Sequence, residues 1–127
     1  ITTILSNLSN KVFAVETDKK IKNEFLNYIK KYNFKNIELV EGSFEKGFSK
    51  NGPYDLIFID NPIKKINDDI LSQLSSNLGK IIMIQKENDY LNQAIKIVNN
   101  DNKFSTQYLF DVFSKYQLYE EKEKFIF

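Results

Sequence analysis

The sequence has 127 residues, of which 42% are hydrophobic, and a formal net charge of +1; this is enough chain for one domain with a buried core. The absence of cysteine and histidine excludes disulfides, thiolate nucleophiles, histidine bases and imidazole metal ligands. With balanced charge, no arginine and no run of ~18 apolar residues, neither nucleic acid nor a membrane is expected as a partner.

The first part of the chain alternates between helical and strand-like patterns. Apolar residues at helical spacing predict a helix over residues 1–8, and the run KVFAVE predicts a short strand over residues 11–16. Asp18 is predicted to be the N-cap of the next helix. That helix has an apolar stripe formed by Ile21, Phe25, Ile29 and Tyr32. Residues 36–40 predict a second strand.

A loop over residues 41–53 contains three of the four glycines and separates these elements from a second group. The run YDLIFID at residues 54–60 is apolar between acids, which predicts a strand covered on both faces. Asn67 or Asp68 is expected to cap a helix that carries Ile70, Leu71 and Leu74. Residues 78–84 predict another buried strand.

The pattern changes after Gln85. Residues 93–98 and 107–113 predict two strands joined by an Asn/Asp turn over residues 99–102, and therefore an antiparallel hairpin at the sheet edge. We predict an α/β fold in one domain over residues 1–127: a Rossmann-like, mostly parallel sheet with helices on both faces and a C-terminal antiparallel hairpin.

Polar residues follow three of the predicted strands, where open α/β sheets bind their ligands. In a complete nucleotide-binding fold, a carboxylate that follows the second strand accepts hydrogen bonds from both ribose hydroxyls. We assign this role to Glu16, which ends the predicted strand over residues 11–16, with Thr17 beside it. Ser43 can hydrogen-bond an adenine edge and Phe44 can cover its face. Asp60 ends the third strand and completes the candidate cofactor site.

Each of these residues also has a structural interpretation. Glu16 is a favourable negative charge near a helix N-terminus. The sequence Asp60-Asn61-Pro62 makes a strand-terminating turn. Ser43 and Phe44 fit an ordinary loop, and Phe58, Phe110 and Phe113 are interpreted as core or edge packing.

Four segments in order resemble one known family. They are residues 11–18 (KVFAVETD), 36–47 (NIELVEGSFEKG), 52–60 (GPYDLIFID) and 70–84 (ILSQLSSNLGKIIMI). Their order is similar to that in protein-L-isoaspartate O-methyltransferases, and residues 109–112 (LFDV) resemble the last strand of that family. The resemblance covers nearly the whole chain, and its specificity comes from the order of the segments rather than from any one motif.

This resemblance implies a cytoplasmic enzyme with S-adenosylmethionine as its cofactor. Such an enzyme transfers a methyl group to the carboxylate of L-isoaspartyl residues in damaged proteins, so the partner is a protein or peptide substrate. The acceptor carboxylate is itself the nucleophile and catalysis is largely positioning, so we assign no catalytic residue. No metal is expected, and the oligomeric state is left open.

The chain also departs from the family. Ser43 stands where the family has an aspartate, and residues 60–64 (DNPIK) replace a small, apolar segment. The ending Phe125-Ile126-Phe127 resembles a divergent bacterial branch of the family. The family's first strand and glycine-rich cofactor loop have no counterpart before Ile1, and we expect residues 1–127 by themselves to bind cofactor weakly and not to turn over.

Three alternatives stay open. Asp60-Asn61-Pro62 faintly resembles the N/D-P-P-aromatic motif of amino-group methyltransferases, but the second proline and the aromatic residue are missing. The chain is alternatively a degenerate, non-catalytic Rossmann-like binding module, which Ser43 favours. A fragment of a nicotinamide-dependent dehydrogenase is the third, and the predicted hairpin argues against it because a dehydrogenase half continues with another helical crossover.

Overall fold

The computed structural model describes residues 1–88 and 90–113. The family-like ending at Phe125-Ile126-Phe127 lies outside these described residues. The chain divides into two compact units, one of residues 1–52 and one that begins at Pro53. Each unit is described below by itself.

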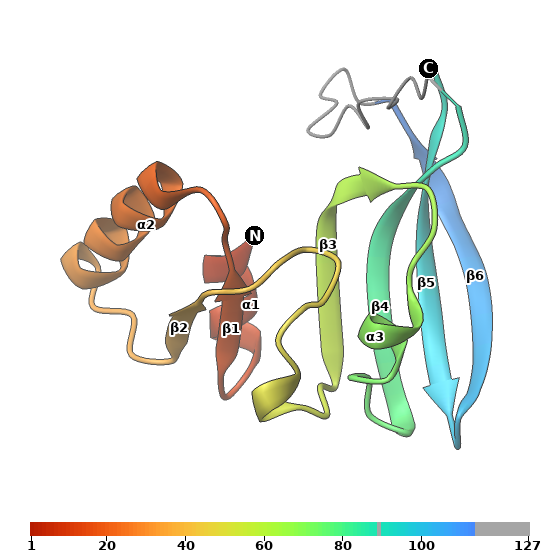
Figure 1. The fold of residues 1–127 in the computed structure, drawn as a ribbon, viewed down its shortest axis with the longest axis horizontal. Helices are drawn as coiled ribbons and strands as arrows, with labels where there is room; N and C mark the ends of the chain where they lie inside the picture. Colours follow the sequence, from red (N-terminus) through yellow and green to blue (C-terminus); the bar gives the residue numbers. More distant parts are fainter. Residues whose placement is uncertain (89, 114–127) are drawn as a thin grey trace, which may run out of the picture. The chain divides into compact units, whose positions relative to one another are not determined.

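The first unit is a β-α-β arrangement preceded by a helix (Figure 1). Its elements are α1 (Thr2–Leu8), β1 (Val12–Val15), α2 (Lys19–Lys31), β2 (Ile37–Val40) and the single 3-10 turn η1 (Ser49–Asn51). Strands β1 and β2 pair in parallel, from Val12 opposite Ile37 to Val15 opposite Val40. The predicted helices and parallel strands of this part of the chain are confirmed.

Both ends of α2 follow from local chemistry. The Asp18 carboxylate accepts hydrogen bonds from the backbone N–H groups of Lys20 (2.7 Å) and Ile21 (3.1 Å), which confirms the predicted N-cap. At the other end Asn33 adopts a left-handed φ of 56°, and the Phe34 N–H donates to the Ile29 carbonyl. These bonds satisfy backbone groups that would otherwise be left open at the helix ends.

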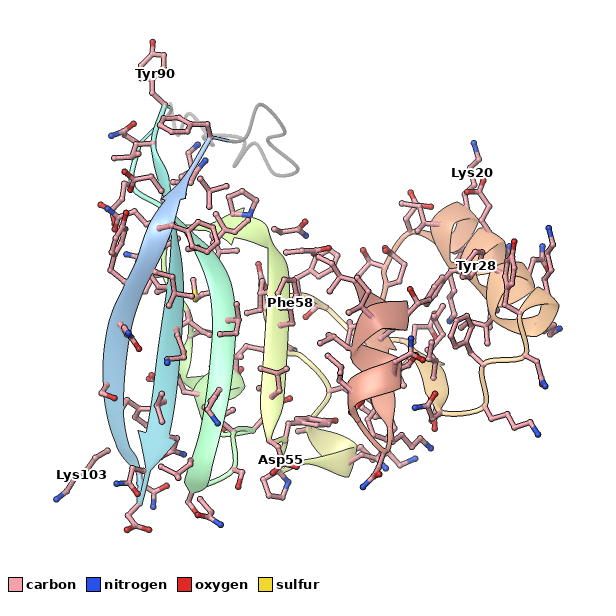
Figure 2. The ribbon with its side chains drawn as sticks, turned by 180° about the vertical axis from the view of Figure 1, so that it is seen from behind. Lys20, Tyr28, Asp55, Phe58, Tyr90 and Lys103 are labelled. Atoms are coloured by element: carbon pink, nitrogen blue, oxygen red, sulfur yellow. The ribbon has the colours of Figure 1, made fainter. Side chains whose placement is uncertain are left out.

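The apolar stripe of α2 is only partly buried. Ile29 is 9% exposed, whereas Ile21 and Tyr32 are 52% and 54% exposed. Aromatic rings lie along the exposed side, where Figure 2 shows Tyr28. The ring centroids of Tyr28 and Tyr32 are 4.6 Å apart. The periodicity therefore predicted the helix correctly, and the structure shows that the first unit buries only part of the stripe.

The first helix is tied to the second strand by one side chain. The Asn36 amide donates to the carbonyls of Ser6 (2.6 Å) and Ser9 (3.0 Å), at the end of α1. It thereby satisfies carbonyl groups that the helix leaves without an internal partner. The residue that begins the predicted second strand thus also anchors α1.

The second unit is a four-stranded sheet with a short helix on one face (Figure 1). Its elements are β3 (Leu56–Ile63), α3 (Asp68–Leu71), β4 (Asn77–Lys86), β5 (Asn92–Asn100) and β6 (Lys103–Val112), and the strands lie in that order. Strands β3 and β4 pair in parallel, whereas β4 with β5 and β5 with β6 are antiparallel pairs. The mixed α/β fold and the C-terminal hairpin are as predicted.

The core of this unit lies between α3 and one face of the sheet. Six buried residues form it: Ile70, Leu74, Ile81, Met83, Ile95 and Ile97. Ile57 and Ile59 of β3 pack against this cluster, because they are paired with Ile81 and Met83 and point to the same face.

The opposite face of the same sheet is more open. Leu56 and Phe58 of β3 are 43% and 37% exposed, and Figure 2 shows Phe58 on the side away from α3. Within the described residues of this unit, α3 covers one face of residues 54–60, and the predicted cover on the opposite face is not seen there. Phe110 and Phe113, which were interpreted as packing residues, are also exposed, by 60% and 82%.

The hairpin turn is tighter than the sequence indicated. Asp101 and Asn102 both have positive φ angles, 51° and 62°, as the two central residues of a type I′ turn require. Asn99 lies in β5 instead of the turn and is 2% exposed. Its amide donates to the Leu74 carbonyl (3.2 Å) and so links the sheet to the segment after α3.

Strand β3 continues past the residues predicted to end it. Ile59 pairs with Met83 and Ile63 with Gln85, so three residues of β3 lie opposite one residue of β4. This bulge contains Asp60, Asn61 and Pro62, and it accommodates a proline that lacks the N–H for regular pairing. The strand-terminating turn expected at Asp60 is therefore not formed.

Candidate functional site

The candidate site of the first unit lies at the carboxyl ends of β1 and β2. Val15 and Val40 form the last pair of the two strands, so Glu16 and the loop after Glu41 leave the sheet at the same edge. Polar groups that follow parallel strands at one edge are where α/β folds place ligands. Four of the five candidate cofactor residues lie in this unit.

Glu16 is held by a backbone hydrogen bond. Its Oε1 accepts from the N–H of Asp18 at 2.8 Å, and the residue is half-buried. Because Asp18 in turn caps α2, the carboxylate is oriented by the start of a helix rather than by a flexible loop. One oxygen is thereby fixed, and the second oxygen remains to accept hydrogen bonds from a ligand.

Thr17 lies between these two acids and is exposed. Its position follows from the short connection between β1 and α2, which leaves only residues 16–18 between the strand and the helix. Thr17 is therefore at the same strand edge as Glu16, as the sequence predicted.

The loop after β2 forms a compact turn centred on Ser43. The Ser43 carbonyl accepts from the N–H groups of Lys46 (3.2 Å) and Gly47 (2.9 Å), and its hydroxyl oxygen accepts from the Lys46 N–H (3.1 Å). Gly47 adopts a left-handed φ of 62°, which a glycine accommodates without strain. Ser43 is half-buried and Phe44 is 42% exposed.

Gly42 brings this loop against β1. A Cβ atom at Gly42 would lie 3.2 Å from Cγ1 of Val15 and 2.8 Å from the Gly47 carbonyl oxygen. A side chain would therefore push the loop away from the residue that precedes Glu16. The structure thus brings Glu16, Ser43 and Phe44 to one edge of one unit.

Asp60 belongs to the second unit and is described there by itself. It is exposed within the bulge of β3, at the carboxyl half of the strand. The bulge directs the backbone of residues 60–62 out of the regular ladder, a feature common beside binding sites. Its part in a cofactor site stays a prediction.

Two features of the site escaped the sequence analysis. The first is the orientation of Glu16 by the Asp18 N–H, for which the Glu-x-Asp spacing was the available signal. The second is the close approach of Gly42 to Val15, which no local pattern indicates. Among residues 1–88 and 90–113, no group of three or more acids is arranged to hold a metal ion, and no helix in that part of the chain is both long and apolar enough to span a bilayer.

Comparison with known proteins decides the family. The family described as Protein-L-isoaspartate(D-aspartate) O-methyltransferase (PCMT) matches residues 1–114. The chain belongs to this family. The resemblance drawn from the four ordered segments is thereby confirmed.

Curated relatives of the protein-L-isoaspartate O-methyltransferase family agree with this assignment. Proteins named protein-L-isoaspartate O-methyltransferase from Alteromonas mediterranea and Shewanella halifaxensis are 30% and 28% identical to the chain, over 83% and 86% of its length. A third with the same name, from Methanococcus vannielii, is 28% identical over 70% of the chain. The chain spans about half the length of these relatives: 49%, 50% and 43%, respectively.

A solved structure supports the fold. A structure titled protein-L-isoaspartate O-methyltransferase matches the chain with a TM-score of 0.73 at 20% identity. The match covers 85% of the chain and 35% of that protein. At this identity the likeness establishes the fold, so the roles of individual residues rest on the geometry described above.

Proposed function

We propose that this chain contributes the adenosine-binding part of an S-adenosylmethionine-dependent protein-L-isoaspartate O-methyltransferase. The bound cofactor supplies a methyl group to the carboxylate of an isoaspartyl residue in a damaged protein. Membership of the family supports the reaction class, and the acceptor and the cytoplasmic setting are part of the proposal.

The residues of the first unit fit the adenosine half of this cofactor. Glu16 accepts hydrogen bonds from the two ribose hydroxyls through the oxygen that the Asp18 N–H leaves free. Ser43 meets the edge of the base, and the exposed ring of Phe44 covers its face. Thr17 adds a hydroxyl group at the same edge.

A single observation carries the proposal most strongly. The carboxylate of Glu16 is held at the end of β1 by the backbone of the α2 cap, next to the loop that Gly42 packs against Val15. Preorganisation of this kind lowers the entropy cost of binding and is typical of ligand sites.

Asp60 has a separate part in the proposal. It stays a candidate cofactor residue of the second unit, with an exposed carboxylate in the β3 bulge. The methyl acceptor is a carboxylate and needs no activation by a protein base, so the contribution of the protein is to position it. No catalytic residue is assigned to the chain.

The decisive experiment is a binding titration with S-adenosylhomocysteine. In a full-length protein that contains this chain, Glu16→Ala should weaken binding by about 1–3 kcal/mol, the usual effect of losing hydrogen bonds to a charged group. Glu24→Ala is the matched control, because it removes the same charge from an exposed position on α2. Isothermal titration calorimetry on the parent and both variants measures the difference.

Two outcomes would overturn the proposal. Equal affinities for the parent and Glu16→Ala would show that Glu16 is only a surface acid near a helix N-terminus. An equal loss in Glu24→Ala would show that net charge, rather than a contact, controls binding.

A further inference from the structure

The base-contacting group of the proposed site is an uncharged hydroxyl whose surroundings are defined. The Ser43 oxygen accepts one hydrogen bond, from the Lys46 N–H at 3.1 Å. Within residues 1–88 and 90–113, the hydroxyl proton has no acceptor, so it is available to a ligand. One lone pair of the oxygen also remains, because a hydroxyl has two.

The surrounding turn limits how far this side chain moves. The Ser43 carbonyl accepts from both Lys46 and Gly47, so the backbone at position 43 is closed into a turn. Gly42 packs that turn against Val15. Rotation about the Cβ–Oγ bond of Ser43 therefore repositions the hydroxyl proton, while the oxygen still accepts the hydrogen bond from the Lys46 N–H.

A hydroxyl and a carboxylate differ in what they recognise. An ionised carboxylate only accepts hydrogen bonds, so it favours a base with an amino group and disfavours one with a carbonyl oxygen at the same position. A hydroxyl both donates and accepts, and it adjusts to either partner by rotation. A group that pairs equally well with two bases does not discriminate between them.

We infer that Ser43 gives this site relaxed selection at the 6-position of the purine, so that it accepts a 6-oxopurine nucleoside about as well as adenosine. This inference rests on the proposed function, because it needs the base to meet the Ser43 turn, and it adds the premise that the 6-position is the part of the base that faces Ser43. It concerns the binding specificity of that site and requires no other residue to change its role. Phe44 contributes equally to both ligands, because stacking on a ring face does not depend on the substituent at this position.

The test compares two ligands that differ at the 6-position and at the adjoining N1, which carries a proton in the 6-oxopurine. S-adenosylhomocysteine presents an amino group there, and S-inosylhomocysteine presents a carbonyl oxygen. Calorimetric titration of the parent protein should give affinities that differ by less than about fivefold, far below the discrimination of a site that reads the substituent by a dedicated hydrogen bond.

Ser43→Asp is the variant that should restore selection. Its carboxylate should weaken S-inosylhomocysteine binding and raise the preference for S-adenosylhomocysteine above about tenfold. Ser43→Ala is the matched control without a polar group, and it should leave the ratio of the two affinities close to that of the parent. Circular dichroism spectra of the three proteins check that the turn change has not unfolded the unit.

The outcomes separate the inference from the proposed function. A parent that binds S-adenosylhomocysteine at least about fivefold more tightly than the inosyl ligand would overturn the relaxed selection and leave the proposed function intact. A full-length parent that binds neither ligand would overturn both. If Ser43→Asp folds and binds but leaves the affinity ratio unchanged, position 43 does not meet the base, and the inference is wrong.

Discussion

The unit that ends at Gly52 and the unit that begins at Pro53 differ in how they bury apolar residues. In the first unit, two hydrophobic residues are buried, Ile29 and Val40. In the second, α3 and three strands enclose six buried residues, with Ile81 fully inaccessible. Four of the five candidate cofactor residues lie in the less buried unit. Binding elements are commonly drawn from the less stable parts of a fold, where loops remain able to adjust to a ligand.

The largest expected effect is the loss of a core side chain from the second unit. Ile81→Ala should lower the free energy of unfolding by about 2–5 kcal/mol, because it leaves a cavity in the packed cluster. Val40→Ala, in the first unit, should cost about 1–2 kcal/mol, since fewer buried groups are removed. Urea unfolding followed by circular dichroism measures both. Equal losses would show that the two units do not differ in the energy of their cores.

A second pair of variants compares the two tightly packed glycines. A Cβ atom at Gly79 would lie 2.5 Å from the Ser75 carbonyl oxygen and 2.9 Å from Cγ of Leu74, so Gly79→Ala should destabilise the protein by about 1–3 kcal/mol. Gly42→Ala should destabilise less, because its closest contact, 2.8 Å to the Gly47 carbonyl oxygen, is longer than the closest contact at Gly79. It should instead reduce the affinity for S-adenosylhomocysteine by displacing the Ser43 turn.

Thermal unfolding and calorimetric titration of both glycine variants separate these effects. Gly79→Ala should leave the affinity of the remaining folded protein close to that of the parent. If Gly42→Ala unfolds the protein more than Gly79→Ala does, the loop after β2 is a structural element of the first unit rather than an adjustable part of a site.

The smallest expected difference concerns the helix caps of the two units. Asp18→Ala removes two hydrogen bonds at the start of the thirteen-residue helix α2 and should cost about 1 kcal/mol. Asn67→Ala removes a bond of 3.0 Å to the Ile70 N–H and should cost only about 0.5 kcal/mol, because Ile70 anchors the short helix α3 in the core. Chemical unfolding of both variants provides the measurement, and a larger loss for Asn67→Ala would contradict this ranking.

Asp18→Ala also tests the origin of Glu16 orientation. The Glu16 carboxylate accepts from the backbone N–H of residue 18, which alanine retains. Ligand affinity should therefore change less in this variant than in Glu16→Ala, although the helix is weakened. The variant thus distinguishes a contact made by the Asp18 side chain from one made by its backbone.

The order and type of the main elements were predictable because their signals are local. Hydrophobic periodicity located the helices α1 and α2 and the strands β1 and β2 of the first unit. The Asn/Asp cluster located the hairpin turn of the second unit. Asp18 was recognised as a cap, and Asn67 as one of two candidates, because side-chain oxygens close to a helix start have few other roles. The predicted ends of the elements were less accurate. Asn99, for example, was predicted as a turn residue but lies buried in β5.

The candidate site was predictable only as a set of strand ends. Glu16 and Ser43 follow parallel strands, and parallel pairing brings them to the same edge. The hydrogen bond from Asp18 to Glu16 and the contact of Gly42 with Val15 depend on how the loops close, which is not encoded in periodicity. The bulge at Asp60 likewise depends on which residue of β4 each residue of β3 faces.

The sequence by itself determined the succession of helices and strands, the caps, the hairpin and the family to which the ordered segments belong. These features depend on side-chain type and spacing over a few residues, or on the order of short motifs. Only the tertiary structure decided which face of the Phe58 strand is covered, where Asn99 finds its hydrogen-bond partner and how the Ser43 turn is held. These features depend on contacts between residues that the local sequence pattern does not link. Burial and hydrogen bonding arise from such contacts and cannot be predicted from one segment alone.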